Sequence, residues 1–229
     1  MFSSGGVARL PQAGRRYLQH AIAPGTVLAT AVRLRMHGEI KLKRWLAFTA
    51  EEVISWTRGM IWRATVRLHG LPISGFDRLL DGAGVMRWRL LGVIPLVTAS
   101  GPDISRSAAG RICAEAVWLP SALCGDGVRW TGWDPTHAEV RLTVQRHALA
   151  MNVATDAAGR LTTVQLQRWG NPDGGPFRAV DFGGVAEDEQ TFGGYTIPTR
   201  LRVGWCVGSR QFEPAGDFFR VTIDDARYC

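Results

Sequence analysis

The sequence predicts an α+β protein: one large, curved antiparallel sheet, either an open or a half β-barrel, with a few helices packed on or in its concave face. Alternation of apolar and charged residues with a period of two recurs along most of the 229 residues. Short turn sequences separate these segments, and no linker or internal repeat divides them. Because so many consecutive strands do not stay flat and exposed, the sheet is expected to curl over the helices.

Three helices are predicted between the strands. Residues 10–22 have apolar positions at helical spacing, and a Pro-Gly pair follows them. A short helix is expected over 49–56, since a threonine can cap it and two glutamates suit its first turn. The central helix is predicted over about 103–119, with an aspartate at its start, before Pro120 disturbs the pattern.

The remaining elements are predicted as strands of a meander, joined in part by turns at residues 81–84 and 156–159. A pair of strands with one solvated face is expected on either side of Gly38. In chain order, the clearest alternating segments are residues 26–36, 40–43, 62–68, 76–80, 86–90, 140–144, 149–155, 160–168, 201–205 and 219–223.

Length and composition favour one domain spanning residues 1–229. A hydrophobic content of 46% over this length can form a core without disulfides or metal. The four cysteines lack C-x-x-C spacing and read as reduced thiols, and the five histidines lack the i, i+4 pairing of a helical metal site. Phosphate-loop, dinucleotide, serine-hydrolase and zinc-protease motifs are all absent. No cofactor and no metal are therefore expected.

The net charge of +7 comes almost entirely from arginines, since Lys41 and Lys43 are the only lysines. These arginines are scattered along the chain and form no basic arm, so specific nucleic-acid binding is not expected. No apolar stretch approaches the length of a membrane span, and residues 1–11 contain no apolar run of signal-peptide length. A cytoplasmic location is the resulting expectation.

Several motifs resemble an uncharacterised bacterial family of domains of unknown function, a 6544-like family. They are RYLQH at 16–20, MHGEI at 36–40 with Trp45 and FTA at 48–50, GMIWRA at 59–64, GAG at 82–84, RICAE at 111–115 with WLP at 118–120, and IPTR at 197–200. The resemblance implies a fold similar to the open β-barrel of bacterial lipoprotein carriers and sterol-like ligand binders, and no established activity. Such carriers act outside the cytoplasm, so lipoprotein transport is not expected here.

The central helix carries the candidate catalytic residues. Ser107, Arg111 and Glu115 are four apart, and Trp118 follows three later, so they share one helix face. If this face points into the sheet, Glu115 can accept a proton and Arg111 can hold an anionic or carbonyl group. The simpler interpretation is a structural or surface ion pair beside a core tryptophan.

Nine tryptophans suggest an aromatic interior. Trp62, Met86, Trp88 and Trp205 lie on the apolar faces of predicted strands, and with Trp118 they are the candidate ligand-binding residues. Their side chains either fill the core or form the walls of a cavity. Four further acids or bases could join a site in space, although turn or surface roles are simpler; they are Asp77, Asp134, His137 and Asp181.

The leading hypothesis is binding of a small hydrophobic molecule in a tryptophan-lined cavity, with Arg111 and Glu115 fixing its polar end. The alternative is a cofactor-independent enzyme, an isomerase, cyclase or hydrolase, that uses Glu115 as general acid or base. A third hypothesis is a structural interaction protein, which would have a solid core and one exposed apolar patch. Nothing in the sequence specifies a ligand, a reaction or an oligomeric state.

Overall fold

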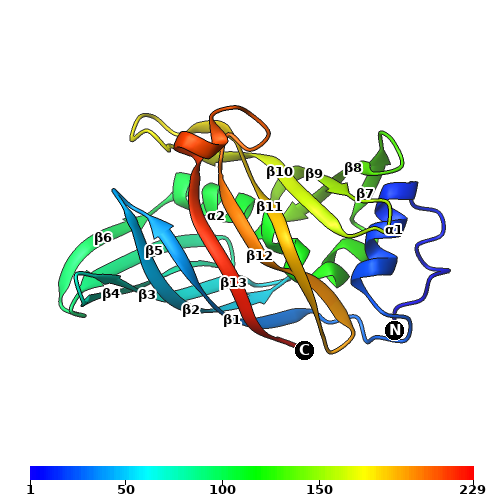
Figure 1. The fold of residues 1–229 in the computed structure, drawn as a ribbon, viewed down its shortest axis with the longest axis horizontal. Coiled ribbons are helices and arrows are strands. Elements are labelled where there is room, and N and C mark those ends of the chain that lie inside the picture. The colour runs from blue at the N-terminus through cyan, green and yellow to red at the C-terminus, as the bar shows by residue number, and fades with distance from the viewer.

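A computed structural model describes all 229 residues and contains one sheet of 13 strands (Figure 1). Every pair of neighbouring strands is antiparallel. The strands are β1 (Ala31–Lys41), β2 (Trp45–Ser55), β3 (Gly59–Leu68), β4 (Leu71–Leu80), β5 (Ala83–Leu90), β6 (Ile94–Ser100), β7 (Arg129–Gly132), β8 (His137–Val144), β9 (His147–Thr155), β10 (Leu161–Gly170), β11 (Arg178–Phe192), β12 (Tyr195–Trp205) and β13 (Asp217–Tyr228).

Two α-helices accompany the sheet: α1 (Gln12–Ala21) and α2 (Pro102–Glu115). Strands β1 to β6 form one half as a meander, strands β7 to β13 form the other, and β1 pairs with β13 to join them. The helix α2 connects the two edge strands β6 and β7, and it contacts strands of both halves, β3 to β6 and β8 to β10. A sheet whose two halves meet one helix must curve around it, which confirms the predicted open, curved antiparallel sheet.

The helix predicted over 49–56 is wrong, because this segment belongs to β2. Every second residue of β2 from Leu46 to Ile54 is buried, and Glu52 occupies one of these inward positions. A glutamate on the inner face breaks the apolar alternation, while the capping signal favoured a helix. The predicted pair of strands around Gly38 is also wrong, since β1 runs through this residue without interruption.

The other two helices are close to the predictions. The N-terminal helix falls inside the expected 10–22. The central helix is shorter than the expected 103–119: its α-helical part ends at Glu115, and a 3-10 turn continues to Trp118. A second 3-10 turn begins at Pro120, whose ring removes a backbone donor and prevents the α-helix from continuing.

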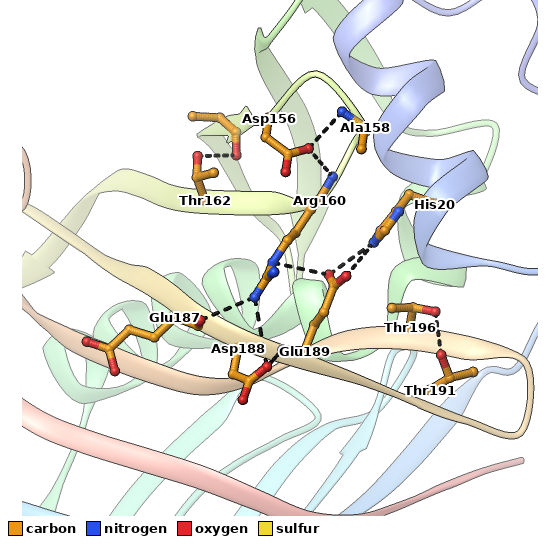
Figure 2. A network of polar contacts seen from close by, with 11 residues as sticks. His20, Asp156, Ala158, Arg160, Thr162, Glu187, Asp188, Glu189, Thr191 and Thr196 are labelled. Carbon is orange, nitrogen blue, oxygen red and sulfur yellow. Dashed lines mark hydrogen bonds and ion pairs between the residues drawn. The ribbon is translucent and has the colours of Figure 1, made fainter.

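Polar contacts attach α1 to β11 in the second half of the sheet (Figure 2). The Nε2 atom of His20 lies 2.9 Å and 3.0 Å from the two carboxylate oxygens of Glu189 on β11. Arg160 approaches the same carboxylate at 3.9 Å and donates a hydrogen bond to the Glu187 carbonyl at 3.2 Å. Asp156 accepts the backbone N–H of Arg160 at 3.0 Å. The turn before β10 and the end of α1 are thus held against β11.

A single apolar cluster of 45 buried residues spans the inside of the sheet and both helices. Tyr17 and Leu18 of α1 belong to it, as do Ile112 and Cys113 of α2. Burial raises the pKa of the Cys113 thiol to about 12. No helix has the length and apolar character needed to cross a membrane.

Candidate functional site

The inside of the sheet is not completely filled: a cavity of about 270 Å³ lies beneath α2. It is lined by residues of α2 and of strands from both halves, and 13 of the 19 lining residues are hydrophobic. This volume is near the lower end for small-molecule sites, which are concave and mostly apolar with a few placed polar groups.

One wall of the cavity comes from a row of residues across the first half of the sheet. Glu52 on β2 is paired with Trp62 on β3, Trp62 with Asp77 on β4, and Asp77 with Met86 on β5. Residues directly opposite each other in neighbouring strands project from the same face, so all four side chains point inward. Three of them, Trp62, Asp77 and Met86, line the cavity, and this wall carries its acidic groups.

The opposite wall comes from a matching row across the second half. Val164 on β10 is paired with Gly184 on β11, Gly184 with Val203 on β12, and Val203 with Phe219 on β13. All four line the cavity. A Cβ atom placed on Gly184 would lie only 3.2 Å from Cγ2 of Val203, so the glycine keeps space open along an otherwise apolar wall.

The third boundary is formed by α2 and the 3-10 turn that follows it. Arg111 and Glu115 line the cavity from the helix, and Trp118 lines it from the turn. The Trp118 indole N–H donates to the carbonyl of Pro198 at 3.0 Å, which fixes the ring against β12. Burial of this polar end leaves the apolar part of the indole to face the cavity.

Arg111 is the centre of a buried ionic cluster. Its Nε donates to Glu115 at 2.5 Å, its Nη2 to Glu52 at 2.9 Å and its Nη1 to Asp77 at 3.4 Å. Burial disfavours the charged guanidinium, but the three carboxyl groups outweigh this effect and raise the pKa of Arg111. Arg111 is therefore already occupied by protein carboxyl groups and has little capacity left for an anionic ligand.

Glu52 is the most buried member of the cluster, with no exposed surface. Burial, followed by the nearby carboxyl group of Glu115, raises the pKa of Glu52 well above its usual 4.5, although Arg111 opposes this. The Oε2 atoms of Glu52 and Glu115 are buried and have no hydrogen-bond partner. The raised pKa favours the protonated, neutral form of Glu52 over a wider pH range than for an exposed glutamate.

A second arginine, Arg168 on β10, lines the cavity without belonging to any ion pair. Its Nε donates to the main-chain carbonyl of Ser107 on α2 at 3.0 Å. Its guanidinium carbon lies 4.5 Å from the ring centre of Phe182 and 5.4 Å from that of Trp205. Burial and the positive charge of Arg111 lower the pKa of Arg168 to about 10, which leaves it cationic at neutral pH.

The structure brings together six of the seven residues singled out in the sequence: Arg111, Glu115, Trp62, Met86, Trp118 and Trp205 all border the cavity. Trp88 does not border it. The Trp88 ring lies behind Trp62, 5.6 Å away between ring centres, and its indole N–H donates to Asp77 at 2.9 Å. Trp88 therefore orients an acidic residue of the cavity wall.

Sequence reasoning missed Glu52, Arg168 and Phe182 as site residues. Glu52 was assigned to a helix, and only the alternation of Leu46, Phe48, Ala50 and Ile54 around it could have indicated an inward position. Arg168 follows a strand pattern that predicts an inward side chain, but one arginine among 27 basic residues carries no signal by itself.

The four isolated acids and bases have different outcomes. Asp77 joins the cluster. Asp134 and His137 form an exposed pair with a 2.9 Å contact, in which backbone hydrogen bonding from Thr136 is the main cause that lowers the pKa of Asp134. Asp181 accepts a hydrogen bond from Gln167 at the surface.

The fold and the cavity together define a protein class: an open, curved antiparallel sheet wrapped around a helix, with an apolar internal cavity bordered by buried charges. The chain belongs to the family of unknown function DUF6920, whose model matches residues 8–228. The predicted resemblance to an uncharacterised family is thus confirmed, with the number 6920 in place of 6544. No curated protein matches the chain in sequence.

Two solved structures are similar to the chain along most of its length. One is a domain from Vibrio parahaemolyticus assigned as an outer membrane lipoprotein-sorting protein, with 9% identity, a TM-score of 0.45 and coverage of 86% of this chain and 85% of that one. The other is a LolA superfamily protein from Nitrosomonas europaea, with 10% identity, a TM-score of 0.46 and coverage of 95% and 92%. At these identities the likeness concerns the chain trace alone.

Proposed function

We propose that the protein binds a small, largely apolar molecule in the cavity beneath α2. The observation that carries this proposal is the hollow itself, about 270 Å³ in volume and surrounded by mostly hydrophobic residues. Protein interiors are close-packed, and a space of this size beside aromatic rings gives up contacts that larger side chains would have made. An apolar ligand restores those contacts and gains the free energy of leaving water.

Binding is better supported than catalysis by Glu115. The Oε1 atom of Glu115 accepts a hydrogen bond from Arg111 at 2.5 Å, and its Oε2 atom is buried without a hydrogen-bond partner. A general acid or base must reach the proton that it transfers. The ion pair of Oε1 with Arg111 and the burial of Oε2 limit the reach of Glu115 toward a substrate.

A purely structural role is also less supported. An apolar patch of the kind expected for an interaction protein is present at the β5–β6 turn and edge strand β6, where Leu91, Val93, Ile94, Leu96 and Val97 are exposed. A solid core, the other expected feature, is missing because of the cavity. The cavity therefore favours ligand binding over a purely structural role.

The test uses N-phenylnaphthylamine, an uncharged apolar dye that fluoresces when it leaves water. The wild-type protein is expected to bind the dye. Val203→Trp places a large ring inside the cavity and is expected to weaken binding by about tenfold or more, about 1.4 kcal/mol or more. Val53→Trp is the matched control, because Val53 is 38% exposed on the outer face of β2 and its substitution leaves the cavity unchanged.

Circular dichroism of both variants checks that the sheet is intact. Equal dye affinity in Val203→Trp and Val53→Trp would place the dye outside the cavity. Absence of dye binding to the wild-type protein, together with native mass spectra that show no co-purified small molecule, would reject the proposed function.

A further inference from the structure

The two arginines at the cavity differ in what they contact. All three nitrogens of Arg111 donate to carboxyl groups. Arg168 has one protein hydrogen bond, from Nε to the Ser107 carbonyl, and no carboxylate within 4.0 Å. A guanidinium has five N–H donors, so the Nη donors of Arg168 have no acceptor in the protein. Arg168 is half-buried at the cavity, and a partly desolvated cation without an acid partner marks a place where an acceptor from outside is favoured.

The structure around Arg168 holds the guanidinium in place at the cavity. Phe182 and Trp205 lie against it at 4.5 Å and 5.4 Å, so aromatic rings replace part of its lost hydration. On the helix side, a Cβ atom on Gly110 would lie 3.0 Å from Cγ of Arg168, so the glycine gives the side chain room beneath α2. With Nε fixed on Ser107, the Nη groups are the free end of a pre-oriented fork.

The acidic side chains at the cavity contact Arg111 rather than Arg168. The carboxyl groups of Asp77 and Glu115 contact Arg111, and burial raises the pKa of Glu52, which disfavours the charged form of that group. None of these carboxyl groups forms an ion pair with Arg168. An anion at Arg168 therefore meets a guanidinium group that no carboxyl group contacts within 4.0 Å.

We infer that the ligand is an amphiphile with a single acidic headgroup, a carboxylate or a phosphate monoester, that Arg168 binds while the apolar chain fills the cavity. This inference rests on the proposed function and names the ligand class for the same cavity. It also replaces the expectation that Arg111 fixes the polar end, because Arg111 is neutralised within the protein. Planar, bidentate recognition of such a group is the contact for which arginine is best suited.

The experiment is isothermal titration calorimetry of the full-length protein at neutral pH with decanoate, decyl phosphate and decanol. These three probes share one chain and differ in headgroup. Arg168→Met removes the charge and keeps a side chain of similar length, and Arg168→Lys keeps the charge without the planar fork. Arg202→Met is the matched control, because Arg202 lies on β12 outside the cavity and pairs with Glu187 and Glu213.

Wild-type protein is expected to bind decanoate or decyl phosphate about tenfold or more tightly than decanol. Arg168→Met should lose this preference while its affinity for decanol and for N-phenylnaphthylamine stays within about twofold. Arg168→Lys should retain part of the preference, and Arg202→Met should retain all of it. The acidic probe that binds more tightly distinguishes a carboxylate headgroup from a phosphate one.

Equal affinity of the wild-type protein for decanol and for both acidic probes would overturn the inference, as would an equal loss of all three probes in Arg168→Met. If the wild-type protein still binds N-phenylnaphthylamine under either outcome, the proposed function stands and only the acidic headgroup is rejected. Failure of the dye and of every probe to bind the wild-type protein would reject the proposed function itself.

Discussion

Glu52 and Arg168 occupy inward positions of strands where apolar side chains ordinarily sit. Both are tolerated because neighbouring groups compensate their burial: Glu52 contacts Arg111 at 2.9 Å, and Arg168 contacts the Ser107 carbonyl and two aromatic rings. Local sequence rules fail at these two positions. Such failures are expected at functional sites, where a fold accommodates residues that its core would otherwise exclude.

Glu52→Gln tests the neutral form of this buried acid. Since the pKa of Glu52 is raised in the folded protein, the folded state holds the proton more tightly than the unfolded state does. Its contribution to stability is fully present below the unfolded-state pKa of about 4.5 and is lost as pH rises through the higher folded-state pKa. The free energy of unfolding of Glu52→Gln is therefore expected to decrease less with rising pH than that of the wild-type protein.

Urea unfolding at about pH 5 and about pH 9 measures this difference. The matched control is Glu51→Gln, because Glu51 is the next residue of β2, faces outward and pairs with Arg33 at an exposed site. This control should follow the wild-type pH dependence. A pH dependence of Glu52→Gln that is the same as that of Glu51→Gln would show that Glu52 is ionised in the folded protein.

At the scale of elements, the position of α2 against the first half of the sheet decides whether the cavity exists. Gly84 on β5 lies directly beneath this helix: a Cβ atom there would be 2.7 Å from the backbone N and Cα atoms of Ser105. The same two residues share a hydrogen bond, from the Gly84 N–H to the Ser105 hydroxyl at 2.9 Å. The close approach of helix and strand thus depends on a glycine at this point.

Gly84→Ala is expected to destabilise the protein by about 1–3 kcal/mol, because backbone atoms must move apart to admit one methyl group. Urea unfolding of the variant measures the loss. Gly127→Ala is the control, since a Cβ atom at Gly127 has no neighbour within 4 Å, and it should change the stability by under about 0.5 kcal/mol. A Gly84→Ala variant as stable as this control would contradict the packing of α2 described above.

Most elements of the fold could be predicted from the sequence, and the reason is physical. In strands such as β3 and β8 every second residue is buried, from Met60 to Val66 and from Ala138 to Val144, and this pattern appears in the sequence as a period of two. The helix predicted over 49–56 failed because Glu52 interrupts the same pattern in β2. Which side chains meet across the cavity could not be predicted, because strand register and the path of α2 place them there.

At the scale of the whole molecule, the cavity lies between the two halves of the sheet. Its acidic wall comes from β3 to β5 and its apolar wall from β10 to β13, and these halves are joined by the pairing of β1 with β13. The helix between the two edge strands then covers the space that the curved sheet leaves. The cavity is therefore lined by residues that lie far apart in the sequence, and no short motif contains them.

The central claim is that an apolar ligand occupies the space beneath α2, and a crystal structure with bromine-labelled decanoate tests it most directly. The account predicts an anomalous bromine signal in the cavity between Trp62, Trp118 and Val203, with the carboxylate on Arg168. A cavity filled by protein side chains, with bromine found only on the outer surface, would contradict it.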